Sequence, residues 1–210
     1  GNISTRYKDR QNSYKDIAWY IKKAVELKTG NYLVFFPSFE YMRNVYEQYK
    51  ELWPKDYTIL QDSYMTDAER EDFLSSFEES PEHSLIAFAV MGGIFSEGID
   101  LTGDRLSGAI IIGVGLPQLS QERDLIARYY NQVKKMGFEY AYMFPGMNKV
   151  LQAAGRVIRT EKDRGFVLLL DDRFLHRRYI NLFPVEWNGY IEVHSPEDMS
   201  NIIANFWNQQ

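Results

Sequence analysis

The chain has 210 residues, of which 45% are apolar and 25% charged, a composition typical of a folded globular domain and not of a disordered segment. It contains no cysteine and three widely spaced histidines, which excludes disulfides, iron–sulfur ligation and a thiol nucleophile and argues against a dedicated zinc site. The formal net charge is −5, and no apolar run approaches the roughly 18 residues of a membrane span, so we expect no membrane partner.

Five short apolar segments have the length of β-strands. Most are continuous runs, such as Leu-Val-Phe-Phe and Val-Leu-Leu-Leu, which is expected of parallel strands that are covered on both faces. We predict strands over Tyr32–Phe36, Tyr57–Leu60, Leu85–Met91, Ala109–Val114 and Phe166–Asp171.

Segments of helical period fill the gaps between these strands. We predict helices over Tyr14–Leu27, Phe39–Leu52, Asp67–Phe77, Glu122–Lys135 and Asn148–Ile158, and a last helix that begins after Ser195. Local signals support several ends: Ser38 can cap a helix, Thr66 and Glu69 form a capping box, and Gly137 is a stop signal.

This alternation predicts a single doubly wound, three-layer α/β domain over residues 1–210, with a mainly parallel sheet and helices on both faces. Ligands of such sheets bind beyond the carboxyl ends of the strands. The loops to search are therefore Pro37–Ser38, Gly92–Gly103 and Asp171–Arg173.

The helix predicted over Asn148–Ile158 carries a cationic stripe. Gln152, Arg156 and Arg159 recur at i, i+4 and i+7, which puts them on one face. Two guanidinium groups one turn apart can grip a phosphate in a fixed fork geometry. Gly155 inside the helix costs about 1 kcal/mol relative to Ala, which we interpret as room for a group that approaches closely. The alternative is a solvated face of an amphipathic helix.

Two strand ends could also meet a ligand. Four glycines fall within Gly92–Gly103 and let the backbone bring its amides close to a ligand, while Glu97 and Asp100 add carboxylates to the same loop. At the other strand end, the helix capped by Ser38 has free amides that could receive a phosphate. The alternatives are a long turn with solvated acids and plain strand–turn–helix architecture.

Taken together, three of these segments resemble motifs IV, V and VI of superfamily 2 helicases. They are Phe36-Pro37-Ser38, Ser96-Glu97-Gly98-Ile99-Asp100 and Gln152-Ala153-Ala154-Gly155-Arg156-Val157-Ile158-Arg159. The resemblance is greatest to the DinG/XPD-like branch of ATP-dependent DNA helicases, covers roughly residues 5–187 and concerns the second RecA-like motor domain only. Motif IV would lie near 33–41, motif V over 92–103 and motif VI over 152–159.

The resemblance implies a catalytic role for the last motif. Arg156 and Arg159 would be arginine fingers that neutralise charge on the transferred γ-phosphoryl group of ATP, a role worth about 10³–10⁵ in rate in related systems. Gln152 would lie near the γ-phosphate or orient the attacking water.

The other two motifs are implied to serve the nucleotide and the nucleic acid. Asp100 would contact the ribose or couple the nucleotide to the strand-binding loop, with Gly98 beside it and Glu97 bracing the loop. Ser38 and the amides of Gly93–Ser96 would face the backbone of single-stranded DNA.

Parts of the implied machine are missing from this chain. It has no phosphate loop and no acidic metal-binding box, so ATP with Mg²⁺ would be held mainly by the N-terminal RecA-like domain of the same protein. The four-cysteine iron–sulfur cluster of many family members would also lie outside this segment. We therefore expect the isolated chain to bind nucleotide poorly and to lack ATPase activity. Its first residue is Gly1 and not Met, which agrees with a processed protein or an excised fragment.

Two other functions compete with a DNA helicase that acts in DNA repair. A translocase or an RNA-remodelling member of the same superfamily would carry the same phosphate-gripping residues. A non-catalytic α/β nucleic-acid-binding module would be expected to lose Arg156, Arg159 or Asp100, and the sequence retains all three. A DNA helicase would act in the cytoplasm, on the nucleoid in a bacterium.

Charge and aromatic residues are unevenly distributed. Residues 67–104 hold ten acidic side chains and one basic, whereas residues 149–178 hold eight basic and four acidic, so a basic surface can face phosphates although the total is negative. Tyr7, Tyr14, Tyr129 and Tyr130 adjoin basic residues and could stack bases, but we expect most of them to pack on the sheet. Trp187 and Trp207 are expected in the core.

Overall fold

A sheet of five parallel strands forms the centre of the protein. The computed structural model describes residues 3–209 apart from 94, 96–104 and 158–162. The strands are β1 (Asn31–Phe36), β2 (Tyr57–Leu60), β3 (Leu85–Val90), β4 (Gly108–Ile112) and β5 (Phe166–Leu170). Their order is β2-β3-β1-β4-β5, which makes β1 central and β2 and β5 the edges. The predicted α/β fold with a parallel sheet is confirmed.

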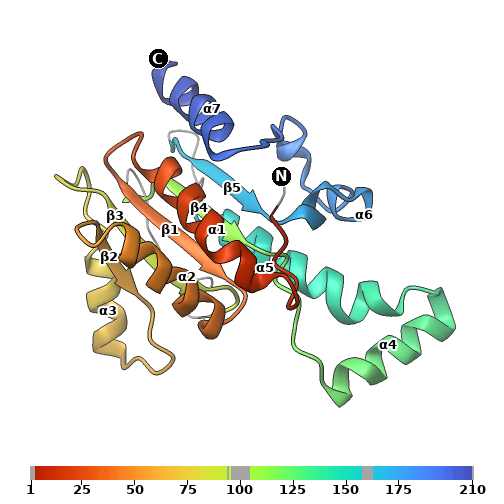
Figure 1. The fold of residues 1–210 in the computed structure, drawn as a ribbon. Helices are drawn as coiled ribbons and strands as arrows, with labels where there is room; N and C mark the ends of the chain where they lie inside the picture. The colour runs from red at the N-terminus through yellow and green to blue at the C-terminus, as the bar shows by residue number, and fades with distance from the viewer. Residues whose placement is uncertain (1–2, 94, 96–104, 158–162, 210) are drawn as a thin grey trace.

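Helices cover both faces of the sheet (Figure 1). On one face lie α1 (Arg10–Val25), α2 (Phe39–Leu52) and α7 (Pro196–Asn208). On the other lie α3 (Asp67–Ser75) and α5 (Phe144–Ala154). Every residue of β1, β3 and β4 is buried. These strands therefore need apolar side chains on both faces, which explains why they read as continuous apolar runs.

A helical hairpin projects from this core. Figure 1 shows α4 (Gln121–Lys134) extending away from the sheet, and none of its residues is buried. It packs against a π-helix, Glu139–Met143, which continues directly into α5. The remaining short helices are α6 (Arg177–Ile180) and two 3₁₀ helices, Asp172–Leu175 and Val185–Trp187.

In this hairpin the predicted start of one helix is wrong, whereas the helix predicted over Glu122–Lys135 agrees with the observed Gln121–Lys134 within one residue. The helical segment predicted to begin at Asn148 begins at Glu139. The π-helix, with its wider turns, precedes Pro145 and accommodates a residue that has no amide hydrogen to donate. The expected stop at Gly137 is instead made at Lys135, which adopts the left-handed conformation with φ 59°.

The aromatic predictions are confirmed in part. Trp187 and Trp207 are partly buried and pack against the two cores, and Tyr14 does the same. The expected packing on the sheet is wrong for Tyr7 and Tyr129, which are 85% and 59% exposed because they lie on the N-terminal segment and on the projecting α4.

Candidate functional site

All five strands are parallel, so their carboxyl ends meet at one edge of the sheet. The segments that leave this edge are Pro37–Ser38 after β1, Gln61 after β2, Met91–Gly93 after β3, Gly113–Gly115 after β4 and Asp171–Arg173 after β5. The two shorter predicted loops, after β1 and after β5, therefore lie at this edge. Of the third, residues 92, 93 and 95 are described.

Ser38 caps α2 at this edge. Its backbone is extended and its Oγ accepts a hydrogen bond from the Tyr41 amide at 3.3 Å. The hydroxyl proton is not used in that bond, so the same side chain can donate to a second oxygen. A capped helix start offers a partial positive charge and outward-facing amides, which suits an anion.

The glycine turn after β3 is braced by a side chain from the neighbouring strand. Gln61 is 4% exposed, and its Oε1 accepts the Val90 amide at 2.8 Å. The Gly93 amide donates to the Val90 carbonyl at 3.3 Å, which closes a tight turn. This turn fixes the start of the loop that carries the predicted motif V. Gln61 was not predicted for this role, since a lone Gln after a strand is common.

Lys149 of α5 lies directly against this turn. A methyl group on Gly92 would lie 2.9 Å from Cε and 3.3 Å from Nζ of Lys149. Gly92 is also in the left-handed region, with φ 71°, so its conformation and the close lysine both require glycine. Within the described part of the chain, Lys149 forms no ion pair. An ammonium group is thus placed at the carboxyl edge, where the sequence analysis had not assigned one.

A buried ion pair closes the same edge beside β5. The Asp171 side chain is fully buried and binds the Arg173 guanidinium, with Nε at 2.7 Å from Oδ1 and Nη2 at 2.9 Å from Oδ2. The Thr5 hydroxyl also donates to Asp171, and the Thr5 amide does so at 3.2 Å. Burial by itself would raise the pKa of Asp171, but the bonds from Arg173 and Thr5 hold that pKa below its ordinary value.

Because every oxygen of Asp171 is occupied by protein donors, we interpret this cluster as structural. It ties the N-terminal segment to the end of β5, and Arg6 adds a further bond to Asp172 at 2.6 Å. Thr5 was not found from the sequence, since 166 residues separate it from Asp171.

The helix that bears Gln152 ends earlier than predicted. α5 stops at Ala154, and Gly155 is its C-cap with φ −65°. The next two amides donate to the carbonyl three residues earlier, as in a 3₁₀ turn. Arg156 donates to Ala153 at 3.3 Å and Val157 to Ala154 at 3.2 Å. Gln152 and Arg156 therefore do not share a face of one continuous helix. Among the described residues, a methyl group on Gly155 would meet only the carbonyls of Leu151, at 3.3 Å, and Gln152, at 3.7 Å, and the predicted close approach of a ligand group there stays a prediction.

This turn lies at the opposite end of the sheet from Ser38. A methyl group on Gly165, which precedes β5, would lie 2.5 Å from Val157 Cγ1 and 2.9 Å from the carbonyl of Ser107, which precedes β4. Arg156, half-buried, is thus held at the amino edge, while Gln152 is exposed on α5. Of the predicted site residues that the structure describes, Ser38 and Arg156 are therefore separated by the length of the strands.

Five of the predicted site residues lie outside the described residues. They are Ser96, Glu97, Gly98, Asp100 and Arg159. Among the residues that are described, no three His, Asp or Glu side chains gather as a metal site would require. A search of the same residues finds no helix whose length and apolar character would let it cross a membrane.

Comparison with known proteins defines the class. Residues 21–190 match the family model described as Helicase C-terminal domain. ATP-dependent DNA helicase XPD of Sulfolobus acidocaldarius is 30% identical over 82% of this chain and 30% of its own length. ATP-dependent DNA helicase CHL1 of Debaryomyces hansenii is 28% identical over 79% of this chain and 23% of its own length. ATP-dependent DNA helicase DinG of Photobacterium profundum is 40% identical over 41% of this chain and 13% of its own length.

Solved structures agree on the fold. The structure titled XPD_Helicase superposes with a TM-score of 0.69 at 25% identity, covering 86% of this chain and 32% of that one. The structure titled XPD_APO superposes with a TM-score of 0.70 at 23% identity, covering 86% of this chain and 36% of that one.

The fold and the matched model together define a RecA-like helicase domain. The chain belongs to the helicase C-terminal domain family, and within it to the C-terminal domains of DinG/XPD-like superfamily 2 helicases. The resemblance inferred from the three motifs is thereby confirmed. The chain spans between 13% and 30% of the length of the curated relatives named above.

Proposed function

We propose that this chain is the second motor domain of an ATP-dependent DNA helicase that moves on single-stranded DNA. The observation that carries the proposal is the match of residues 21–190 to the helicase C-terminal domain, a stretch that contains all three phosphate-directed motifs. In this proposal the two edges of the sheet bind different phosphates. The amino edge contacts the phosphate of ATP, and the carboxyl edge contacts the phosphates of the nucleic acid.

Arg156, at the amino edge, acts as an arginine finger, and Arg159 of the same motif, which lies outside the described residues, has the same role. ATP bound by the first motor domain brings its γ-phosphoryl group to them, and their charge offsets the charge that develops in transfer. Gln152 lies one turn before Arg156, exposed on α5, where it can orient the attacking water. In the loop that follows β3, whose residues 96–104 lie outside the described part of the chain, Asp100 contacts the ribose, with Gly98 and Glu97 shaping that loop.

At the carboxyl edge, Ser38 and the turn that begins at Gly93 hold the backbone of the strand. The Ser38 hydroxyl retains a proton to donate, and Lys149 supplies a positive charge beside Gly92. Contacts of this kind go to phosphates and carry no base sequence, as a motor that moves along any strand requires.

Mg²⁺ is held elsewhere in this scheme. The described residues offer no group of three carboxylate or imidazole ligands, and the sequence has no phosphate loop. ATP with Mg²⁺ therefore binds mainly to the first motor domain, and this chain contributes the residues that complete the site.

The direct test is Arg159→Ala in the full-length protein. We expect ATP hydrolysis to fall by about 10³-fold or more, since one arginine finger is worth that much, while affinity for single-stranded DNA stays nearly intact. Steady-state ATPase rates and fluorescence anisotropy of a labelled oligonucleotide measure the two quantities. Arg159→Lys is the matched control: it keeps the charge but lacks the planar fork, and we expect only a small recovery of rate.

Unchanged turnover in Arg159→Ala would remove this residue from the finger role. Robust hydrolysis by the purified 210-residue chain would overturn the assignment of ATP binding to another domain.

A further inference from the structure

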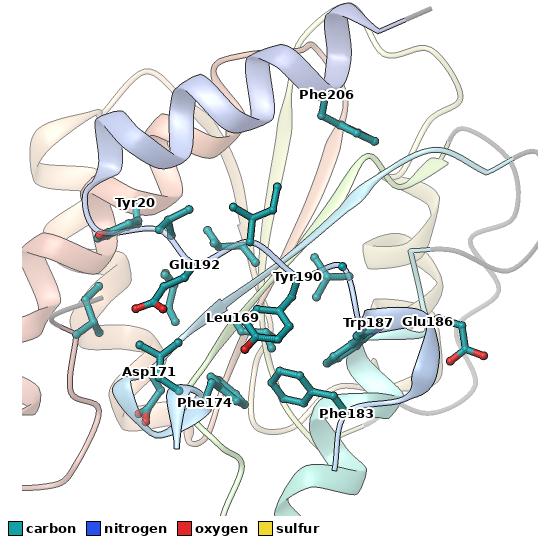
Figure 2. Close-up of a pocket in the computed structure, with 18 of the residues that line it drawn as sticks. Tyr20, Leu169, Asp171, Phe174, Phe183, Glu186, Trp187, Tyr190, Glu192 and Phe206 are labelled. Atoms are coloured by element: carbon teal, nitrogen blue, oxygen red, sulfur yellow. The ribbon is translucent and has the colours of Figure 1, made fainter. Parts of the chain in front are cut away.

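The N-terminal segment, residues 3–9, crosses the carboxyl edge of the sheet before the chain enters α1 (Figure 1). It is fixed to the end of β5, where Figure 2 shows the Asp171 side chain and where the Thr5 amide donates to Asp171 at 3.2 Å. A methyl group on Gly113, which follows β4, would lie 2.8 Å from Thr5 Oγ1 and 3.8 Å from Pro37 Cγ. The segment therefore lies beside the ends of β5, β4 and β1, close to the capped start of α2.

Three further contacts make this segment an ordered turn. The Asp9 amide donates to the Arg6 carbonyl at 2.8 Å, which closes a turn that has Tyr7 in its second position. The Ser4 hydroxyl donates to Asp9 at 2.7 Å, and Arg6 donates to Asp172 at 2.6 Å. Because these bonds fix the backbone of the turn, the direction of the Tyr7 side chain is set by the fold and not by the freedom of a chain end.

The Tyr7 ring projects from this turn and is 85% exposed. The Arg10 guanidinium lies 5.7 Å from the centre of the Tyr7 ring and 5.0 Å from the centre of the Tyr41 ring, which is buried. Arg10 is itself held in place, since its Nε donates to the Thr5 carbonyl at 3.1 Å. A cation in contact with both rings keeps the exposed one oriented. An aromatic ring that is held in place but open to solvent is suited to stacking on another planar group.

These contacts lead directly to Ser38. The Tyr41 amide, in the first turn of α2, donates to Ser38 Oγ at 3.3 Å, so Tyr7, Arg10, Tyr41 and Ser38 form a continuous series of contacts. The turn is also basic, because residues 6–10 hold three basic side chains and one acidic. Basic groups around an open ring favour a nucleic acid as the ligand, since its bases stack on rings while its phosphates attract positive charge.

We propose that the Tyr7 ring stacks on a base of the single-stranded DNA whose backbone is bound by Ser38. The inference rests on the proposed function, in which the carboxyl edge holds that strand. Ser38 and Lys149 contact phosphates, whereas Tyr7 contacts a base, so the nucleotide at this edge is held by its base as well as by its backbone. Every base has a planar face, so stacking tolerates any sequence, as a motor that moves along the strand requires.

Binding of two oligonucleotides of equal length to the full-length protein tests the proposal. One is an oligothymidylate, and the other has the same backbone with an abasic residue at every position. We expect Tyr7→Ala to weaken binding of the oligothymidylate by about 10-fold or more, the usual loss when a stacking ring is removed, and to leave binding of the abasic strand unchanged. Fluorescence anisotropy of the labelled strands measures both affinities.

Two further variants separate stacking from other effects of the side chain. Tyr7→Phe keeps the ring and should bind both strands as the wild type does. Tyr7→Leu keeps an apolar side chain without a ring and should lose as much affinity for the oligothymidylate as Tyr7→Ala. Wild-type affinity in Tyr7→Leu would mean that the apolar character of the side chain, and not stacking, matters.

Unchanged affinity of Tyr7→Ala for the oligothymidylate would overturn the proposal. So would an equal loss on both strands, because the ring would then act through the backbone or the fold. A lower melting temperature of Tyr7→Ala without DNA, at wild-type affinity, would show that protein covers the ring and would likewise refute stacking. The proposed function is tested separately by Lys149→Gln, which should weaken both strands by the same factor, and it fails if the wild type binds neither strand.

Discussion

At the scale of single residues, the arrangement depends on a few buried polar contacts that join distant parts of the chain. The Asp171 carboxylate is the clearest, because it accepts bonds from Arg173 in its own loop and from Thr5 near the N-terminus. Such a pair adds little net stability when intact, but removal of one partner leaves the other charge buried and uncompensated.

Asp171→Asn should therefore destabilise the protein by about 3 kcal/mol, measured by urea unfolding at pH 7. The neighbour Asp172 pairs with Arg6 at the surface, and Asp172→Asn should cost less than about 1 kcal/mol. Equal losses in the two variants would show that burial of the Asp171 pair is unimportant.

The same contact predicts the response to acid. The pKa of Asp171 is lower in the folded protein than in the unfolded chain, so its contribution to the free energy of unfolding is complete above about pH 4 and is lost as the pH falls through the folded pKa. The stability of Asp171→Asn should fall less steeply than that of the wild type below pH 4. A parallel fall in both would contradict the assigned pKa direction.

At the scale of elements, local signals determined where sequence-based prediction succeeded. The bounds of α2 (Phe39–Leu52) and β2 (Tyr57–Leu60) were predicted as observed. Ser38 caps the helix, and the strand is a short, mostly apolar run that follows Pro54 and Asp56. The start of α3 was predicted for the same reason, since Thr66 and Glu69 form the expected capping box.

The capping box also gives a prediction for α3. The Thr66 hydroxyl oxygen accepts a hydrogen bond from the Glu69 amide at 3.3 Å. The Thr66 amide in turn donates to Oε2 of Glu69 at 2.7 Å. Thr66→Ala should lower the free energy of unfolding by about 1 kcal/mol, as measured by urea titration. Thr66→Ser keeps the hydroxyl and should behave like the wild type, and a loss of the same size in that variant would mean that the methyl group, not the cap, matters.

Other elements could not be predicted, because their ends are set by contacts across the fold. α5 ends at Ala154 with Gly155 as its C-cap, earlier than predicted, in the place where Val157 packs against Gly165. The site residue Lys149 gave no signal for a similar reason. A single lysine on an apolar helix is common, and only its contact with Gly92 gives it a role.

At the scale of the whole molecule, the parallel sheet holds residues that the proposed function uses at its two opposite edges. Ser38 and Lys149 lie at its carboxyl edge, and Arg156 lies at its amino edge. The motifs in the sequence pointed to Ser38 and Arg156 but not to Lys149 or to the separation between the two edges, which follows from the antiparallel course of α5 relative to β4 and β5.

The central claim, that the two edges do different work, is tested by comparing Arg156→Ala with Lys149→Gln in the full-length protein. We measure ATPase rate and the salt dependence of single-stranded DNA affinity for both, with Lys15→Gln, an exposed lysine on α1, as the charge control. Arg156→Ala should lose hydrolysis and keep the salt slope, whereas Lys149→Gln should weaken the strand and reduce the slope by about one phosphate contact. Loss of both quantities in the same proportion in both variants would contradict the account.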